Sequence, residues 1–216
     1  MSYNNILVDV TDAIMRITIN RPKQLNALNG ETIAELSTVF KEGETNSAVR
    51  TIIITGAGDK AFVAGADIKE FAEFSIEEGR ELSRAGHHNL FDLVEGLKTP
   101  VIAAINGYCL GGGLELAMAC HIRIASDNAM MGLPEVSLGV IPGYGGTQRL
   151  TQLVGKGKAL ELIMTAGMMK AEDAKDWGLV NHITFQNELM GMAEKIASKI
   201  AKNSPMAIGL AIEAVN

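Results

Sequence analysis

The amino-acid sequence predicts an α/β protein built on one main domain. Segments typical of strands alternate with segments typical of helices, and the C-terminal part is mostly helical, a pattern found in α/β folds. With 47% hydrophobic and 20% charged residues, the chain has enough apolar side chains for a folded core. Its 216 residues contain no linker-like stretch, which favours a single core domain.

Charge and cysteine content exclude several classes of protein. The 19 Lys and Arg residues against 25 Asp and Glu residues give a net charge of −6, so the sequence lacks the basic surface of a nucleic-acid-binding protein. The two cysteines, Cys109 and Cys120, form no zinc-binding pair and no disulfide framework. The longest apolar runs fall far short of the roughly 20 residues that cross a bilayer. We therefore expect a cytoplasmic protein that binds neither nucleic acid nor membrane.

The first elements are a β-hairpin and a helix. Residues 6–10 and 14–20 have the β-branched and apolar pattern of two strands, and the short connection between them predicts a hairpin. Apolar residues then recur at the helical positions Ile33, Leu36 and Phe40.

Two buried strands follow, and each one precedes a run of glycine and alanine. Residues 51–55 and 101–106 are almost continuously apolar, which is typical of strands covered on both faces. Between these strands, Ser75 and Glu78 form a capping-box pattern that begins a long helix ending before Pro100.

The remaining elements are one helix, one strand and a helical C-terminal part. Residues 114–120 have the small apolar side chains of a packed helix, and residues 121–125 return to a strand pattern. Helical spacing then predicts helices at 148–154, 158–165, 171–177 and 187–202.

The glycine-rich runs 56–65 and 107–113 are the first candidate for chemistry. Each run joins a buried strand to a helix, and glycine lets a backbone N–H approach a ligand oxygen closely. Two converging N–H groups would form an oxyanion hole. Tight turns and close helix–sheet packing are the structural alternative for each run. Neither run matches a nucleotide-binding motif.

Two carboxylates beside the second run, Glu115 and Glu135, are the second candidate. Both lie among apolar residues, so each must face water, find a partner or have a raised pKa. If both face one pocket, burial and repulsion favour a single shared proton, and one group acts as acid while the other acts as base. Exposure to solvent is the alternative for either residue.

Other reactive residue types lack a supporting pattern. The four histidines, His87, His88, His121 and His182, have no ligand-spaced partners, so we expect no metal site. Neither cysteine has a neighbouring base, and no nucleophilic serine motif is present.

Seven sequence segments, in order along nearly the whole chain, closely resemble the enoyl-CoA hydratase/isomerase (crotonase) family. Each segment alone is a weak signal, and their combination with the expected spacing is specific. They are NRP at 20–22, LNAL at 25–28, FVAGADI at 62–68, PVIAAING at 100–107, GGGLELA at 111–117, PE at 134–135 and GVIPGYGGTQRL at 139–150.

The resemblance implies a fold, a substrate class and an assembly. The expected fold is a spiral of ββα units, and the expected substrate is a coenzyme A thioester, with no separate cofactor and no metal. The expected assembly is a homotrimer or a hexamer made of two trimers. The backbone N–H groups of Ala66 and Gly112 would form the oxyanion hole. The residues implied in substrate and CoA binding are Ala64, Ala66, Asp67, Ile68, Lys69, Gly112 and Gly143.

The pair of glutamates favours hydration within this family. Glu115 and Glu135 match the two catalytic glutamates of the hydratases, and the resemblance implies addition of water to the 2,3 double bond of a short-chain trans-2-enoyl-CoA. We assign Glu115 to the attacking water and Glu135 to the proton delivered to Cα. Leu133 stands where many hydratases have Gln, which changes the hydrogen bonding available to Glu135.

Alternative functions and an incomplete C-terminal segment complete the sequence-based expectations. We expect a spiral core over residues 1–190 and the start of a longer, truncated helical segment over 191–216. The alternatives are an isomerase or another acyl-CoA lyase of the same family, and a non-catalytic CoA-binding module. The sequence does not specify the acyl chain length or the metabolic pathway.

Overall fold

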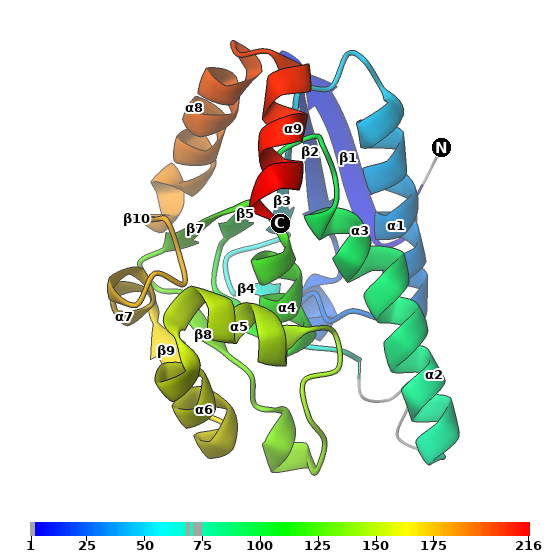
Figure 1. Cartoon of the computed structure of the whole chain (residues 1–216), viewed down its shortest axis with the longest axis vertical. Helices are drawn as coiled ribbons and strands as arrows, with labels where there is room; N and C mark the ends of the chain where they lie inside the picture. Colours follow the sequence, from blue (N-terminus) through cyan, green and yellow to red (C-terminus); the bar gives the residue numbers. More distant parts are fainter. Residues whose placement is uncertain (1–2, 68–69, 71–74) are drawn as a thin grey trace.

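The computed structural model describes residues 3–67, 70 and 75–216, and its core is a mixed six-stranded β-sheet (Figure 1). The hairpin predicted from the sequence is confirmed: β1 (Ile6–Thr11) and β2 (Ile14–Ile19) pair antiparallel, whereas the other neighbours in the sheet pair parallel. The strand order is β1-β2-β3-β5-β7-β10. The remaining strands are β3 (Thr51–Gly56), β5 (Val101–Ile105), β7 (Ile122–Ser126) and β10 (His182–Thr184).

A second, four-stranded sheet was missed by the sequence analysis. Its order is β4-β6-β8-β9, and each strand has three residues: β4 (Ala61–Val63), β6 (Tyr108–Leu110), β8 (Met130–Gly132) and β9 (Met168–Lys170). Segments this short show no alternation of apolar and polar residues, and the first two of them lie inside the glycine-rich runs that we expected to be loops. The pairing of Met131 with Met169 explains two of the methionines as core residues.

The two sheets arise from a repeated unit of two strands and a helix. The pairs β3/β4, β5/β6 and β7/β8 each contribute their first strand to the large sheet and their second to the small one. A helix follows each pair, so the expected spiral of ββα units is confirmed. The α-helices are α1 (Gly30–Thr45), α2 (Ile76–Gly86), α3 (Asp92–Glu95), α4 (Gly112–Ala119), α5 (Gly146–Val154), α6 (Lys156–Thr165), α7 (Ala171–Asp176), α8 (Leu189–Ala201) and α9 (Pro205–Val215).

The long helix predicted before Pro100 is interrupted by a wider turn. The capping box of Ser75 and Glu78 begins α2 as expected, and a π-helical turn, η3 (His87–Phe91), joins α2 to α3. Such π-turns inside helices are frequent near functional sites. Within the described elements, short 3-10 helices lie at η1 (Pro22–Gln24), η4 (Glu135–Leu138) and η5 (Gln186–Glu188).

The helices cover the sheets and bring α4 close to the small one. Helix α8 lies over one face of the large sheet, where Leu189 packs with Ile53 and Ile102 (Figure 1). Helix α4 is buried along its whole length. A Cβ at Gly113 would collide with the Val63 backbone, so glycine is required for α4 to rest directly on β4. In the described part of the chain, no helix is both long and apolar enough to cross a membrane.

Candidate active site

A cavity of about 190 Å³ brings the two glycine-rich segments and both candidate glutamates together. Both carboxylates and both expected oxyanion-hole residues line it, together with two further residues implied in binding, Ala64 and Gly143. The described residues that line it are Ala64, Gly65, Ala66, Leu110, Gly111, Gly112, Glu115, Pro134, Glu135, Leu138, Gly143 and Tyr144. Such a concave, largely apolar site with a few polar groups is typical of a small-molecule site.

The two expected oxyanion-hole residues, Ala66 and Gly112, both line the cavity. Gly112 is the first residue of α4, so its N–H has no acceptor within its own helix. Leu28 forms a parallel bridge with Ala66, in which the Leu28 N–H donates to Gly65 O at 2.9 Å and the Asp67 N–H donates to Leu28 O at 2.7 Å. Because successive amides of an extended segment point to opposite sides, the Ala66 N–H faces away from Leu28.

Glu115 is a buried carboxylate held by two backbone amides. The N–H groups of Tyr144 and Gly146 both donate to its Oε1, each at 2.8 Å, and the residue is 1% exposed. Burial raises the pKa of Glu115 to about 7, and the nearby Glu135 charge also raises it, while the two amides and the Arg149 charge oppose this rise. Because both amides bind Oε1, the second oxygen, Oε2, is the one available to a molecule in the cavity.

Glu135 lies opposite, at the first position of η4. Burial raises the pKa of this carboxyl as well. Its Oε2 is buried and has no hydrogen-bond partner in the part of the chain that the structure describes. Leu133, whose side chain is fully buried, offers it none. A buried oxygen without a protein partner is expected to bind a water or a substrate atom.

Of the described residues implied in CoA binding, Asp67 does not line this cavity. Asp67 instead forms an ion pair with Arg21, with Nη2 and Oδ2 3.0 Å apart. It does not line the cavity, so this part of the expected contact set is not brought to the site. Ile68 and Lys69 lie outside the described residues.

Sequence reasoning missed the contribution of Tyr144. Its amide holds Glu115, and its ring stacks on Phe91 with centroids 4.5 Å apart and planes 9° apart. The glycines flanking it were the available signal, because they indicate special backbone, but sequence alone does not show which carboxylate that backbone meets.

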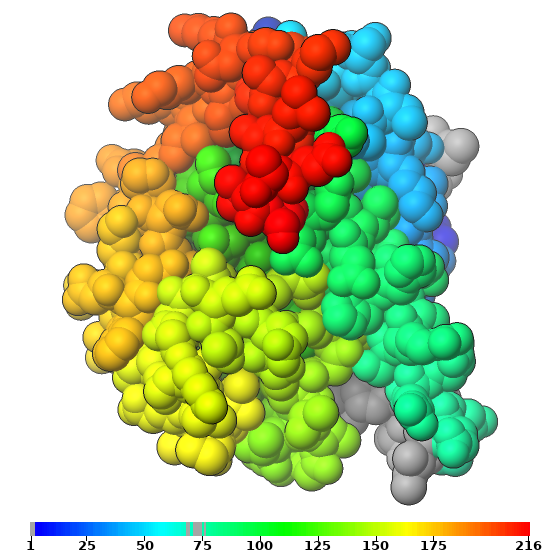
Figure 2. All heavy atoms as spheres, in the orientation of Figure 1, coloured from blue at the N-terminus to red at the C-terminus, as the bar shows by residue number. Residues whose placement is uncertain are grey.

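A second, larger cavity of about 920 Å³ lies between α4, α5 and α9. Figure 2 shows α9 in red and the yellow-green helices α5 and α6 on this face. Neither Glu115 nor Glu135 lines this cavity. Size alone therefore does not identify the candidate active site; the clustered carboxylates and amides do.

Two of the histidines lie beside a carboxylate of α3. His87 and His88 both lie near Asp92, with His87 Nε2 2.9 Å from Asp92 Oδ1. Among the residues with described positions, no group of three or more His, Cys, Asp or Glu side chains is arranged to hold a metal ion.

The sequence matches a known protein family over nearly its whole length. The sequence model of the enoyl-CoA hydratase/isomerase family matches residues 9–216. The chain belongs to the enoyl-CoA hydratase/isomerase family. The short-chain-enoyl-CoA hydratase of Clostridium acetobutylicum is 50% identical over 216 residues, which are 100% of this chain and 82% of that protein. The crotonyl-CoA hydratase of Syntrophomonas wolfei is 45% identical over 100% of this chain and 83% of that protein.

Solved structures of the enoyl-CoA hydratase/isomerase family have the same fold. The crystal structure of an enoyl-CoA hydratase from Bacillus anthracis superposes with a TM-score of 0.94 and 45% identity, covering 98% of this chain and 82% of that one. The crotonase-like α/β fold expected from the sequence is therefore confirmed.

Proposed function

We propose that this family member is a hydratase that adds water across the 2,3 double bond of a short-chain trans-2-enoyl-CoA, giving a 3-hydroxyacyl-CoA. The observation that carries the proposal is that the buried Glu115, the half-buried Glu135 and the two expected oxyanion-hole residues, Ala66 and Gly112, line one small cavity. The names of two relatives, a short-chain-enoyl-CoA hydratase and a crotonyl-CoA hydratase, support the same reaction and substrate.

The amides of Ala66 and Gly112 would bind the thioester oxygen. When water attacks Cβ, negative charge builds on that oxygen as the enolate forms. Two fixed N–H donors stabilise this charge more than they stabilise the neutral thioester, and the helix dipole at the first turn of α4 adds to the effect. Stabilisation that is greater in the transition state lowers the barrier.

The two glutamates would supply the proton transfers. Glu115 takes a proton from the attacking water and Glu135 delivers a proton to Cα, so the pair must hold one proton before the reaction. Burial and mutual repulsion favour this singly protonated pair. The carboxyl groups and amides of the protein perform every step of this hydration, so the proposal includes no metal or redox cofactor.

The remaining parts of the proposal concern binding, assembly and location. Ala64 would line the adenine side of the CoA site, Gly143 would lie in the cavity wall near the attacking water, and Asp67, Ile68 and Lys69 would contact CoA. A homotrimer or a pair of trimers is the proposed assembly, which sedimentation would test. A cytoplasmic location stays a prediction from the sequence.

The direct test of the proposed function follows the absorbance of the enoyl thioester after mixing the protein with crotonyl-CoA. We expect rapid loss of absorbance with the wild-type protein and almost none with Glu135→Gln, which keeps the side-chain shape and removes the acid. Mass spectrometry of the product should show the gain of one water. Equal rates for both proteins would contradict the role of Glu135, and the absence of turnover with wild type would contradict the hydratase function.

Glu115 and Glu135 share one proton, so the raised pKa of about 7 describes the loss of that proton from the pair. Hydration is therefore expected to slow as the pH rises through about 7. Above this pH the second carboxyl ionises, the shared proton is lost and no acid remains, so kcat/KM should fall by about tenfold per pH unit. The measurement is kcat/KM for crotonyl-CoA between about pH 6 and pH 9. Binding of a saturated acyl-CoA over the same range corrects for ionisation of the substrate. A rate that rises over this interval would identify the doubly ionised pair as the active form.

A further inference from the structure

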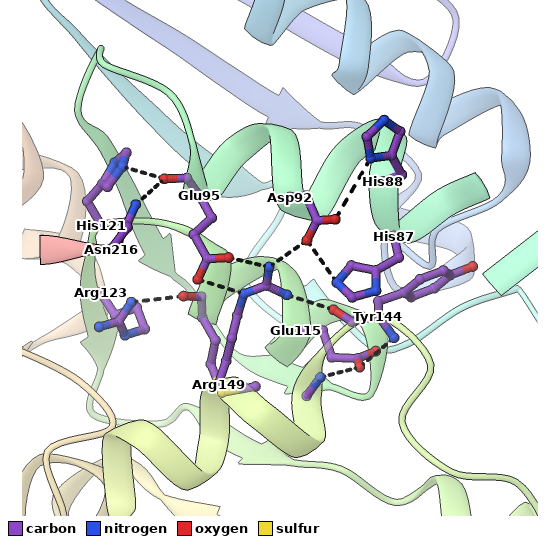
Figure 3. A network of polar contacts seen from close by, with 12 residues as sticks. His87, His88, Asp92, Glu95, Glu115, His121, Arg123, Tyr144, Arg149 and Asn216 are labelled. Carbon is purple, nitrogen blue, oxygen red and sulfur yellow. Dashed lines mark hydrogen bonds and ion pairs between the residues drawn. The ribbon is translucent and has the colours of Figure 1, made fainter. Parts of the chain in front are cut away.

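Arg149 is a buried arginine whose guanidinium contacts both an acidic pair and the backbone next to Glu115. It lies on α5, and its side chain is only 7% exposed. Nε and Nη2 donate to Glu95 at 3.0 and 2.6 Å, and Nη2 also donates to Asp92 Oδ1 at 3.1 Å (Figure 3). The remaining nitrogen, Nη1, donates to the backbone oxygen of Tyr144 at 2.9 Å. The carboxylates of Asp92 and Glu95 on α3 thus fix the Arg149 guanidinium, which in turn donates a hydrogen bond to the Tyr144 carbonyl.

The segment held by Arg149 is the one that holds Glu115. The carbonyl of Tyr144 accepts from Arg149, while the amides of Tyr144 and Gly146 donate to Glu115 Oε1 (Figure 3). Between these amides, Gly145 has φ +90°, and a Cβ there would collide with the Arg149 guanidinium. A left-handed glycine therefore lets the arginine approach this turn closely.

We propose that Arg149 is a positioning residue for hydration: by holding the Tyr144 carbonyl, it keeps the amides of Tyr144 and Gly146 aimed at Oε1 of Glu115, so that Oε2 faces the water that attacks the enoyl thioester. This role rests on the proposed hydratase function. Arg149 does not line the cavity of the two glutamates, so it acts through the backbone turn and not by contact with the substrate. Displacements of about 1 Å of a reacting group can cost roughly 100-fold in rate.

The electrostatic surroundings of Glu115 make this role measurable by pH. Among the described residues, the titratable and charged groups that face Glu115 are Glu135 on η4, Tyr144 in the turn before α5, and Arg149 on α5. The two amides and the Arg149 charge lower the pKa of Glu115 against the effect of burial. Loss of Arg149 removes its charge and loosens both amides, so the pKa of Glu115 rises further. The alkaline limb of the pH profile should then move to higher pH.

The test compares Arg149→Met with wild type in crotonyl-CoA hydration across the pH range. We expect kcat to fall roughly 100-fold, KM to change by less than about threefold, and the alkaline limb to move to higher pH. Arg149→Lys keeps the positive charge and one donor for the Tyr144 carbonyl, so it should recover part of kcat and an alkaline limb near that of wild type. Saturated acyl-CoA binding, measured in parallel, should be unchanged.

Arg123→Met is the matched control for losing a buried arginine. Arg123 is also buried, but it donates to the backbone oxygens of Cys120 and Leu179, away from the Tyr144–Gly146 turn. We expect it to lower the melting temperature while kcat per folded protein and the pH profile stay those of wild type. A merely structural role for Arg149 would give that same pattern for Arg149→Met, and this result would overturn the inference.

The experiment also covers the case in which Arg149→Met does not fold and the case in which the wild-type protein does not hydrate crotonyl-CoA. If Arg149→Met does not fold, Asp92→Asn replaces it, because it removes one carboxylate partner of Arg149 at a half-exposed position. A smaller loss of kcat together with a shift of the alkaline limb supports the role, and a wild-type profile overturns it. Absence of hydration by the wild-type protein overturns the proposed function and this role together, whereas hydration with unchanged variants overturns this role alone.

Discussion

Replacing Glu115 with Gln is expected to lower kcat for hydration of crotonyl-CoA by about 1,000-fold. The amide of Gln can accept the hydrogen bonds of Tyr144 and Gly146 through its oxygen, so the side chain should keep its place. It cannot take a proton from water. The measurement is the loss of enoyl-thioester absorbance under saturating substrate, with KM expected to stay close to that of wild type because the side chain's shape is kept.

Two further measurements on Glu115→Gln, its stability and its rate of isomerisation, distinguish a loss of catalytic chemistry from a loss of structure. Because the fold raises the pKa of Glu115 to about 7, ionisation of this buried group destabilises the protein as the pH rises from the unfolded value of 4.5 through 7. Glu115→Gln removes this penalty, so at pH 8 the variant should unfold no more easily than wild type. Isomerisation of a 3-enoyl-CoA, where it is measurable, should be comparatively intact, since it requires no attacking water. Full hydration by the variant would show that Glu115 does not activate the water.

Replacing Gly112 with Pro is expected to lower kcat by roughly 100- to 1,000-fold, the effect of losing one oxyanion-hole donor. Proline has no N–H, so the thioester oxygen would lose one of its two proposed donors. Gly112 is the first residue of α4, a position where proline fits a helix. Unfolding followed by circular dichroism would show that the fold is kept, and the crotonyl-CoA assay would give the rate.

Gly112→Ala is the matched control, because it adds a Cβ and keeps the N–H. The atoms that this Cβ would approach, on Tyr144 and Leu28, lie 3.5 Å away or more, which is ordinary van der Waals contact. We expect the alanine variant to keep most of the wild-type activity. Equal losses in both variants would mean that space at this position matters and that the N–H does not.

Part of the fold and part of the site follow from local sequence patterns. The hairpin and most helices have periodic apolar residues that a single sequence displays, because one face of each element must be buried. The strands β3 and β5 are visible as continuous apolar runs buried on both faces, and the start of α2 is visible as the capping box at Ser75. The sequence also showed the glycine-rich runs that follow two strands, and the two carboxylates that lie among apolar residues. Both patterns lower the stability of the folded state, so a structural or functional reason is expected for each. These features led to the prediction that Glu115 and Glu135 are the reacting groups.

The tertiary structure decided which of these groups meet and what holds them. The four-stranded sheet is built from three-residue strands that pair with partners distant in the sequence, so no local sequence pattern predicts this sheet. Likewise, the hydrogen bonds from Tyr144 and Gly146 to Glu115, and those from Arg149 to Asp92 and Glu95, join segments that are far apart in the chain. The ion pair of Asp67 with Arg21 likewise joins two segments that no local pattern relates. The sequence determined which reactive groups this protein carries. Burial and backbone hydrogen bonds exist only in the folded chain. They decided the surroundings of each carboxylate and hence its proton affinity.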